Sequence, residues 1–346
     1  MRVQKKEQQD GKIEMIVTAT PDELAEPLQI AQQQLAVHSD IDLVTCGDLD
    51  QALAEAVDES FATSFIENSV MCALAPFAVT QEQLDIVMEP QTRSIGAPLS
   101  KGAEYTFAVT VTCKPEYQLS SYEPVELALP DTAMTEEEID EQLRNMADSY
   151  ATYEGEGGAA VKVVPEITDE WLAQNVPEVE SLEHFRELLR EQGNRAKTHK
   201  LEDMKPYLTV TELAKRFEGA IPDDLFEYTH NDMMRNVTAA LMQQKMTMAE
   251  YLKQLDVDER QFSMQMMMQA REVIAQGLSL DALARHLKLE VTDHDIEQVL
   301  EAMAPGHAQD AREQYERSGR MYQVIENARR NKANDWLVKT ARFVSA

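Results

Sequence analysis

Beyond Pro130 the apolar residues of this 346-residue chain recur almost everywhere at the spacing of an α-helix. Glycine, which weakens helices, occurs only 12 times in the whole chain. Helix starts are marked by Thr247-x-x-Glu250 and Thr292-x-x-Asp295, and stops are predicted at Gly277 and at Pro305-Gly306. Helices are therefore predicted over 181–201, 222–246, 248–256, 258–276, 280–288, 292–303 and 320–341.

The first 118 residues show a different pattern. Residues 12–20 and 105–113 alternate apolar and polar side chains, which predicts two β-strands. The sequence Thr20-Pro21-Asp22-Glu23 then has the form of a capping box and predicts a helix that ends near His38. A second amphipathic helix is predicted from Leu49 to Phe65. This part is expected to be a small antiparallel sheet packed against helices.

The predicted fold is therefore an α+β N-terminal domain followed by a mainly α-helical C-terminal domain with arms. The boundaries expected are 1–118 for the first domain and 119–346 for the second. Within the second domain a connecting helix is predicted over 131–152, a flexible glycine-rich joint over 154–160, and the arms and body over 165–346.

Composition and charge argue against several classes of protein. The first twenty residues lack the apolar core of a secretory signal, and no stretch has about 18 uninterrupted apolar residues, so a cytoplasmic protein without a membrane span is expected. The net charge of −30 disfavours direct binding to nucleic acid or to an anionic membrane. Three widely spaced cysteines predict no disulfide framework and are interpreted as small buried side chains.

No catalytic, metal-binding or cofactor-binding motif is recognised. The seven histidines never occur at the i, i+4 spacing of a helical metal pair, and neither a nucleophile motif nor a phosphate-binding glycine loop is present. The triplet Asp293-His294-Asp295 is interpreted as a helix start with acidic residues at the positive end of the helix dipole. No catalytic residue, metal or cofactor is predicted.

The order of these parts resembles the trigger factor family, bacterial chaperones that meet nascent chains at the ribosome. The resemblance rests on short phrases that follow one another in the family's order. They are Ser94–Pro98 before the strand at 105–113, Lys114–Leu119 after it, Thr135–Asp140, Pro165–Trp171, Ile221–Leu225, Val291–Ile296 and the closing helix around Asp335–Leu337. The resemblance implies a ribosome-docking N-terminal domain, a prolyl isomerase domain, and a helical body with two arms that hold unfolded or nascent polypeptides.

Two departures from the family pattern change that expectation. The family's Gly-Phe-Arg-x-Gly-x-x-Pro ribosome-docking loop is replaced by His38–Asp48, which has three aspartates and no arginine, so family-type docking on ribosomal RNA is not expected. Only twelve positions separate Tyr153 from Pro165, where the family carries an isomerase domain of about one hundred residues. The isomerase is therefore expected to be absent, and the protein is not expected to be an enzyme.

Methionine is the one informative enrichment, because 12 of the 18 methionines follow residue 200. They could fill an irregular core, form a soft-metal site, or offer an adaptable surface to varied apolar segments. Since successive helical residues lie 100° apart, Met266, Met267 and Met268 cannot share one buried stripe. The residues proposed to contact client polypeptides are Met233, Met234, Val237, Leu241, Met242, Met264, Met266, Met267 and Met268.

These features predict a trigger-factor-like holding chaperone that binds unfolded polypeptides, without isomerase activity and without standard ribosome docking. Its negative charge favours basic clients. The rival hypothesis is a dedicated partner-binding protein or homodimer whose Met-rich faces form one fixed interface.

Overall fold

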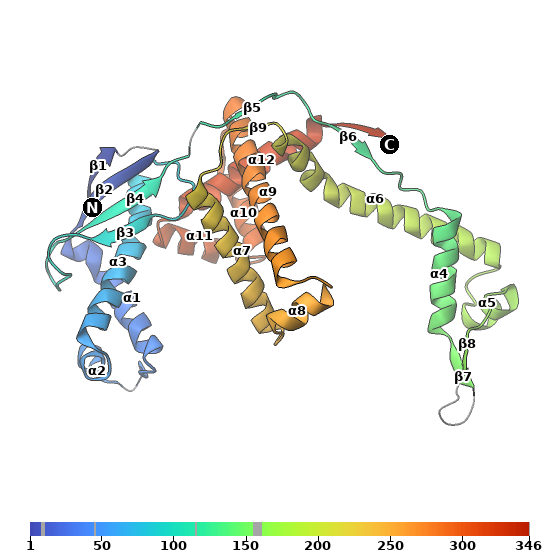
Figure 1. The fold of residues 1–346 in the computed structure, drawn as a ribbon, viewed down its shortest axis with the longest axis horizontal. Coiled ribbons are helices and arrows are strands. Elements are labelled where there is room, and N and C mark those ends of the chain that lie inside the picture. The colour runs from blue at the N-terminus through green and yellow to red at the C-terminus, as the bar shows by residue number, and fades with distance from the viewer. Residues whose placement is uncertain (8–10, 45, 115, 155–160, 346) are drawn as a thin grey trace. The chain divides into compact units, whose positions relative to one another are not determined.

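The computed structural model describes residues 1–7, 11–44, 46–114, 116–154 and 161–345. The chain divides into two compact units (Figure 1). The first unit consists of Met1–Tyr122 and Leu213–Asn334, and the second of Glu123–Glu212 and Asp335–Ala346. Each unit is therefore assembled from two segments that are distant in the sequence.

The first unit begins with a four-stranded antiparallel sheet. Its order is β1 (Arg2–Glu7), β2 (Lys12–Ala19), β4 (Tyr105–Thr112) and β3 (Gln91–Ser94). Met15, Val17 and Ala19 are fully buried, because alternate residues of a strand point to the same face of a sheet. Both strands predicted from the alternation of apolar residues are confirmed.

Two long helices supply the rest of this core, α1 (Pro21–His38) and α3 (Glu59–Gln81). Thr20 and Glu23 form the predicted capping box at the start of α1. By length and composition α3 could cross a membrane, and among the described residues it is the one helix that could. Its residues Val70, Leu74 and Ala78 are buried in the core cluster with the sheet, which accounts for its apolar composition.

The prediction of a single helix from Leu49 to Phe65 was wrong. The structure has α2 (Leu49–Ala56) and then α3. The Asp58 carboxylate accepts hydrogen bonds from the backbone N–H groups of Ser60 and Phe61, so it caps a new helix at this point. The apolar spacing continues across the break, and spacing alone therefore concealed it.

Six helices make up most of the remainder of the first unit: α7 (Asp223–Gln243), α8 (Met248–Gln254), α9 (Glu259–His286), α10 (Asp293–Met303), α11 (Ala308–Arg317) and α12 (Met321–Thr340), whose last residues belong to the second unit. Capping boxes begin α8, α9 and α10. The predicted stop at Pro305-Gly306 holds, because α10 ends at Met303. Helix α11 was not predicted, since its residues are mostly polar and none is buried.

The predicted stop at Gly277 was wrong, because α9 continues through it to His286. Ile274, Leu278 and Leu283 are buried on either side of the glycine and keep the helix packed. A Cβ atom at position 277 would lie 3.4 Å from Cζ of Arg330. The glycine therefore makes room for a guanidinium group and does not end the helix.

A charge cluster around the buried Lys114 joins the sheet region to α9 and α12, and its other members are Asp85, Asp281, Glu326 and Arg330. Lys114 is only 4% exposed, and its Nζ lies 2.8 Å from Glu326, 3.1 Å from Asp281 and 3.4 Å from Asp85. Arg330 makes two hydrogen bonds to Asp281, at 2.8 and 2.7 Å. Burial alone would raise the pKa of Asp281, but Arg330 and Lys114 outweigh it and hold that pKa below its ordinary value.

The second unit contains α4 (Glu136–Ser149), α5 (Asp169–Asn175) and most of α6 (Leu182–Ala214). A parallel pair joins β6 (Glu126–Leu129) to β10 (Arg342–Ser345), and an antiparallel pair joins β7 (Thr152–Glu154) to β8 (Val161–Val163). Apart from residue 154, the predicted glycine-rich joint lies outside the described residues. The predicted fold class is confirmed: a small antiparallel sheet with helices, followed by a mainly helical C-terminal part.

Candidate functional site

Helices α7 and α9 lie side by side, and α8 connects them (Figure 1). Leu241 on α7 and Phe262 and Met266 on α9 are buried. Tyr251 of α8 packs edge-on against Phe262, with 6.0 Å between the ring centroids. The apolar side chains of the three helices therefore hold this region together, and Leu241 and Met266 belong to its interior.

Other methionines of the same helices face solvent. Met242 is 72% exposed, Met264 56%, Met267 41% and Met268 68%. Met233, Met234 and Val237 on α7 are partly buried. The expectation that Met266, Met267 and Met268 cannot share one buried stripe is confirmed, since only the first of them is buried.

Two shallow hollows lie beside these exposed methionines. One, of about 510 Å³, is lined on α7 by Met234, Met242 and neighbouring polar residues. The other, of about 610 Å³, is lined at the start of α9 by Met264, Met267 and charged residues that include Arg260. Flexible thioether side chains around a hollow can adapt to apolar groups of different shapes.

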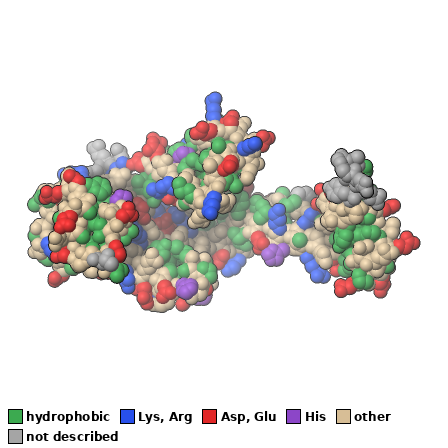
Figure 2. All heavy atoms as spheres, turned by 90° about the horizontal axis from the view of Figure 1, so that it is seen from below, with side chains coloured by type: hydrophobic (Ala, Val, Ile, Leu, Met, Phe, Trp, Pro, Cys, Tyr) green, Lys and Arg blue, Asp and Glu red, His purple; other side chains and the backbone are tan. Residues whose placement is uncertain are grey.

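The wider surface mixes apolar and acidic side chains. Figure 2 shows hydrophobic groups exposed among Asp and Glu side chains on the face that it presents. Between Lys12 and Arg93 the sequence contains no lysine or arginine. Apolar groups lie at and after the end of α1: Val44 is 92% exposed, and His38 stacks on the rings of Phe61 and Phe65.

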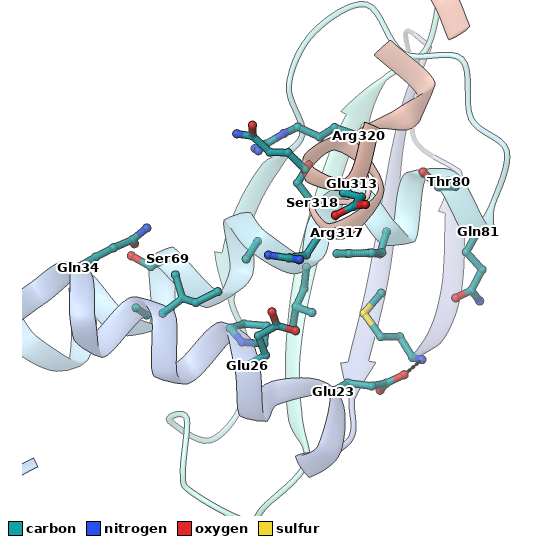
Figure 3. A pocket seen from close by; sticks show the side chains of 18 of the residues that line it. Glu23, Glu26, Gln34, Ser69, Thr80, Gln81, Glu313, Arg317, Ser318 and Arg320 are labelled. Carbon is teal, nitrogen blue, oxygen red and sulfur yellow. Dashed lines mark hydrogen bonds and ion pairs between the residues drawn. The ribbon is translucent and has the colours of Figure 1, made fainter. Parts of the chain in front are cut away.

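A groove in the first unit is lined by α1, α3 and α11 and measures about 1020 Å³ (Figure 3). The sequence reasoning missed it, because α11 was not predicted and the groove exists only once that helix stands opposite α1. Glu26 of α1 and Arg317 of α11 both line it. Ile30, an apolar residue of α1 that is exposed, also lines the groove.

The acidic triplet at the start of α10 has a structural role. Among the described residues no three His, Cys, Asp or Glu side chains gather as a metal site would require. In the triplet at the start of α10, Asp295 accepts hydrogen bonds from Lys332 and from Thr292. Lys332, then the cap, lower the pKa of this carboxyl far below its ordinary value, so it serves as a helix cap. The expectation of buried cysteines was wrong: Cys72 is exposed, and Cys46 and Cys113 are only partly buried.

Comparisons with known proteins agree with this architecture. Residues 1–146 match the family model of the bacterial trigger factor protein, and residues 181–339 match the model of its C-terminus. The trigger factor of Geobacillus kaustophilus is 22% identical over 331 residues, which cover 71% of this chain and 77% of that protein. The trigger factor of Caldicellulosiruptor saccharolyticus is 21% identical over 382 residues, with 86% of each chain covered.

A solved structure reported as "Promiscuous Substrate Recognition in Folding and Assembly Activities of the Trigger Factor Chaperone" is 15% identical, with a TM-score of 0.40 and coverage of 98% of this chain and 99% of that one.

The two family matches and the α+β and helical parts define a molecular chaperone. The residues from 147 to 180 lie between the two matched regions. The chain belongs to the trigger factor family of bacteria.

Proposed function

We propose that this protein is a cytoplasmic holding chaperone that binds unfolded or partly folded polypeptides on the exposed methionine faces of α7 and α9. The observation that carries the proposal is the exposure of Met242, Met264, Met267 and Met268 on two helices whose buried residues already pack against each other. These side chains are not needed to hold the helices together. They are therefore available to apolar segments of a client.

The residues proposed to contact clients differ in burial and therefore in role. Leu241 and Met266 support the helix pair from inside, while the exposed methionines make the contacts. Met233, Met234 and Val237 lie at the margin, partly buried and partly accessible. Thioethers suit this role because they are flexible and polarisable, so one surface can accept different side chains.

The experiment measures light scattering of an unfolded model protein at a near-stoichiometric ratio of chaperone. We expect the native chain to suppress aggregation. The double variant Met242→Gln, Met268→Gln should bind clients about tenfold more weakly, equivalent to about 1.4 kcal/mol. The control Met204→Gln, Met303→Gln replaces two exposed methionines outside these faces and should leave binding unchanged. No suppression at several-fold excess of the native chain would reject the proposal.

We also propose that this family member has no prolyl isomerase activity. The backbone that leaves α4 enters β7, and β8 pairs with β7 through Thr152↔Val163 and Glu154↔Val161. Only six residues lie between these two paired strands. So short a segment supports the proposal that no separate aromatic-lined proline site is built there. Catalysis of prolyl isomerisation in a tetrapeptide assay above the uncatalysed rate would contradict this.

Ribosome docking of the family type is not part of the proposed function. The segment 38–48 carries three aspartates, Asp40, Asp42 and Asp48, and no lysine or arginine. Contact with RNA would bring like charges together without releasing counterions. Co-sedimentation with ribosomes at physiological salt tests this, and salt-resistant binding would overturn it.

The second candidate function is a dedicated partner-binding protein or a homodimer that buries the same methionine faces. Their exposure is also what an unoccupied fixed interface would present. Crosslinking in native lysate separates the two functions. Many unrelated chains support the chaperone, and one stoichiometric partner or a stable dimer that binds no unfolded chain supports the fixed interface.

A further inference from the structure

The groove between α1 and α11 combines an apolar floor with an acidic rim. Its floor includes Pro27 and Ile30 of α1 and Ala73 and Phe77 of α3. Ile30 is 42% exposed and lines the groove, so its aliphatic side chain is accessible to a ligand there. The floor therefore offers apolar contact to a ligand.

The rim of the groove carries a surplus of negative charge. Five carboxylates line it, against the guanidinium groups of two arginines: Asp22, Glu23, Glu26, Asp310 and Glu313 against Arg317 and Arg320.

Some of these charges have partners already. The Met1 amino group binds Glu23, Arg320 lies 3.9 Å from Glu89, and His307 lies 3.2 Å from Asp310. Asp22 and Glu26 make no ion pair within the described part of the chain. Figure 3 shows Glu26 on the α1 side of the groove and Glu313 and Arg317 on the α11 side.

The α11 side of the groove is held against α3 by contacts of the turn that follows α11. Thr80 of α3 donates a hydrogen bond to the carbonyl oxygen of Gly319, 3.0 Å away. Gly319 also packs on the ring of Phe77 so closely that a Cβ atom there would lie 2.8 Å from Cγ of the phenylalanine. The turn between α11 and α12 is thereby fixed against α3.

The length of the groove favours a polypeptide over a small molecule. Its lining follows α1 from Asp22 to Gln34, about 18 Å of helix. That length corresponds to about five or six residues of extended chain. The volume of about 1020 Å³ also lies at the upper end of the range for small-molecule sites.

We propose that this groove binds a cationic polypeptide segment in which aliphatic side chains adjoin lysines or arginines. Aliphatic groups cover Ile30 and the floor formed by α3, while the cationic groups reach Asp22, Glu26 and Glu313 on the rim. The inference rests on the proposed function for the nature of the ligand, a polypeptide. It adds a second contact region, separate from the methionine faces, that selects clients by charge.

The experiment uses the full chain and fluorescence anisotropy of three labelled twelve-residue peptides. The first alternates leucine and lysine, the second has glutamate in place of lysine, and the third has serine in place of leucine. We expect the first to bind and the other two to bind at least tenfold more weakly. Equal binding of the leucine–lysine and leucine–glutamate peptides would overturn the proposal.

Protein variants locate the binding. Glu26→Lys with Glu313→Lys reverses two rim charges and should weaken binding of the leucine–lysine peptide at least tenfold. The matched control Glu137→Lys with Glu141→Lys changes net charge equally on exposed positions of α4 and should change affinity less than twofold. Ala73→Trp fills the floor without changing charge and should also weaken binding tenfold. An equally large loss of peptide affinity in the control, or unchanged affinity in Ala73→Trp, would show that the peptide does not bind in the groove.

The same variants separate this inference from the proposed function. Groove variants should still suppress aggregation of an acidic client, whereas Met242→Gln with Met268→Gln should impair that suppression and retain peptide binding in the groove. Loss of only one of the two activities in each variant is the expected result. Loss of both activities in every variant would refute two separate contact regions.

Discussion

At the scale of single residues, the charge cluster around the buried Lys114 constrains how the first unit packs. Its members come from the segment after α3, the end of β4, and helices α9 and α12. Buried charges are tolerated only when they are paired and hydrogen-bonded, because leaving one partner unpaired in a low-dielectric interior is costly. The cluster therefore specifies how the sheet region packs on the helical body of the first unit.

The variant Asp281→Asn should lower the free energy of unfolding by about 2–4 kcal/mol at pH 7. The pKa of Asp281 is depressed in the folded state, so its contribution is complete above the ordinary value of about 3.9 and is lost as the pH falls through the folded pKa. The difference between native and variant should thus be constant above about pH 5 and shrink below about pH 4.

Urea unfolding followed by circular dichroism at several pH values measures this difference. Both tryptophans, Trp171 and Trp336, lie in the second unit, so their fluorescence is the poorer probe. The control is Asp224→Asn, since the pair between Asp224 and Lys12 is exposed and should contribute less than about 1 kcal/mol. If the difference in the free energy of unfolding between the native chain and Asp281→Asn grew as the pH fell, the pKa of Asp281 would not be depressed in the folded state.

Two glycines with positive φ angles test the contact that closes one end of the groove. Gly306 has φ +76° and nothing within 4 Å of an added Cβ, whereas Gly319 has φ +68° and faces Phe77. Gly306→Ala should cost about 1–2 kcal/mol from the left-handed backbone alone. Gly319→Ala should cost about 1–3 kcal/mol more, because the methyl group also overpacks against the ring. Thermal unfolding measures both losses of stability. If the two variants lost equal stability, the close contact between Gly319 and Phe77 would be absent in solution.

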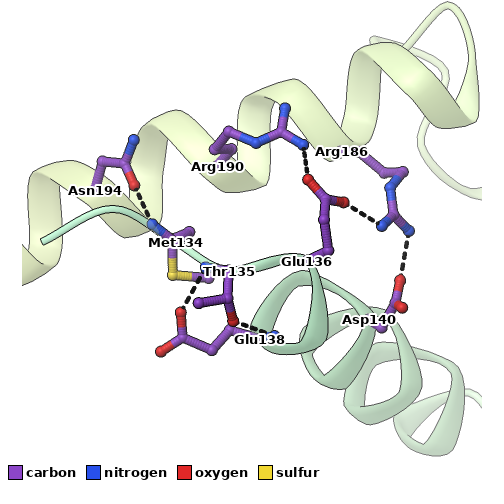
Figure 4. Close-up of polar contacts among 8 residues, drawn as sticks. All are labelled: Met134, Thr135, Glu136, Glu138, Asp140, Arg186, Arg190 and Asn194. Atoms are coloured by element: carbon purple, nitrogen blue, oxygen red, sulfur yellow. Dashed lines mark hydrogen bonds and ion pairs between the residues drawn. The ribbon is translucent and has the colours of Figure 1, made fainter. Parts of the chain in front are cut away.

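At the scale of elements, a polar clasp fixes α4 on α6 in the second unit (Figure 4). Arg186 binds Glu136 at 2.7 Å and Asp140 at 2.6 Å, and Arg190 binds Glu136 at 2.5 Å. Arg186 and then Arg190 hold the pKa of Glu136 below its ordinary value. Gly193 receives Met134 so closely that a Cβ there would lie 2.5 Å from the methionine Cγ. The connecting helix predicted over 131–152 is thus a shorter helix, 136–149, docked at its N-terminal end.

Removing the clasp should loosen α4 without unfolding the unit. In the variant Arg186→Gln, Arg190→Gln we expect the backbone amides of 136–149 to exchange about tenfold faster with deuterium, because the helix loses its side-chain anchors. The control Arg195→Gln breaks an exposed pair with Glu191 on the same helix and should leave exchange in α4 unchanged. Unchanged exchange in the double variant would show that apolar packing alone holds α4.

At the scale of the whole molecule, charge is the dominant property. The net charge of −30 is concentrated toward the N-terminus, where residues 1–160 hold 8 Lys and Arg against 30 Asp and Glu. Such a field attracts cationic polypeptides over a distance set by the ionic strength. We infer that charge governs how fast clients arrive, and that the apolar faces govern how long they stay.

The association rate of an unfolded basic protein should therefore fall about tenfold when the salt concentration rises from about 50 to about 500 mM. For an unfolded acidic protein of similar length the rate should change little or rise, because screening removes repulsion. Stopped-flow fluorescence with labelled clients measures both rates. Equal salt dependence for the two clients would refute steering by the chain's charge.

The sequence predicted the elements better than the site. Alternation in β2 and β4 and the capping boxes at Thr20, Thr247 and Thr292 identified strands and helix starts, because these signals act within a few residues. The end of α2, the continuity of α9 and the presence of α11 were not predicted. Each depends on a capping side chain or on packing that apolar periodicity does not record.

By itself the sequence determined that this chain has an α+β part followed by helices, that it resembles the trigger factor family, and that three successive methionines cannot all be buried. Local backbone preferences and the 100° helical step are sufficient for those conclusions. Only the tertiary structure decided that Met242 and Met268 face solvent while Leu241 and Met266 do not. It alone showed that Gly277 accommodates Arg330 and that α1, α3 and α11 enclose a groove. These features depend on contacts between residues far apart in the chain, which no local pattern encodes.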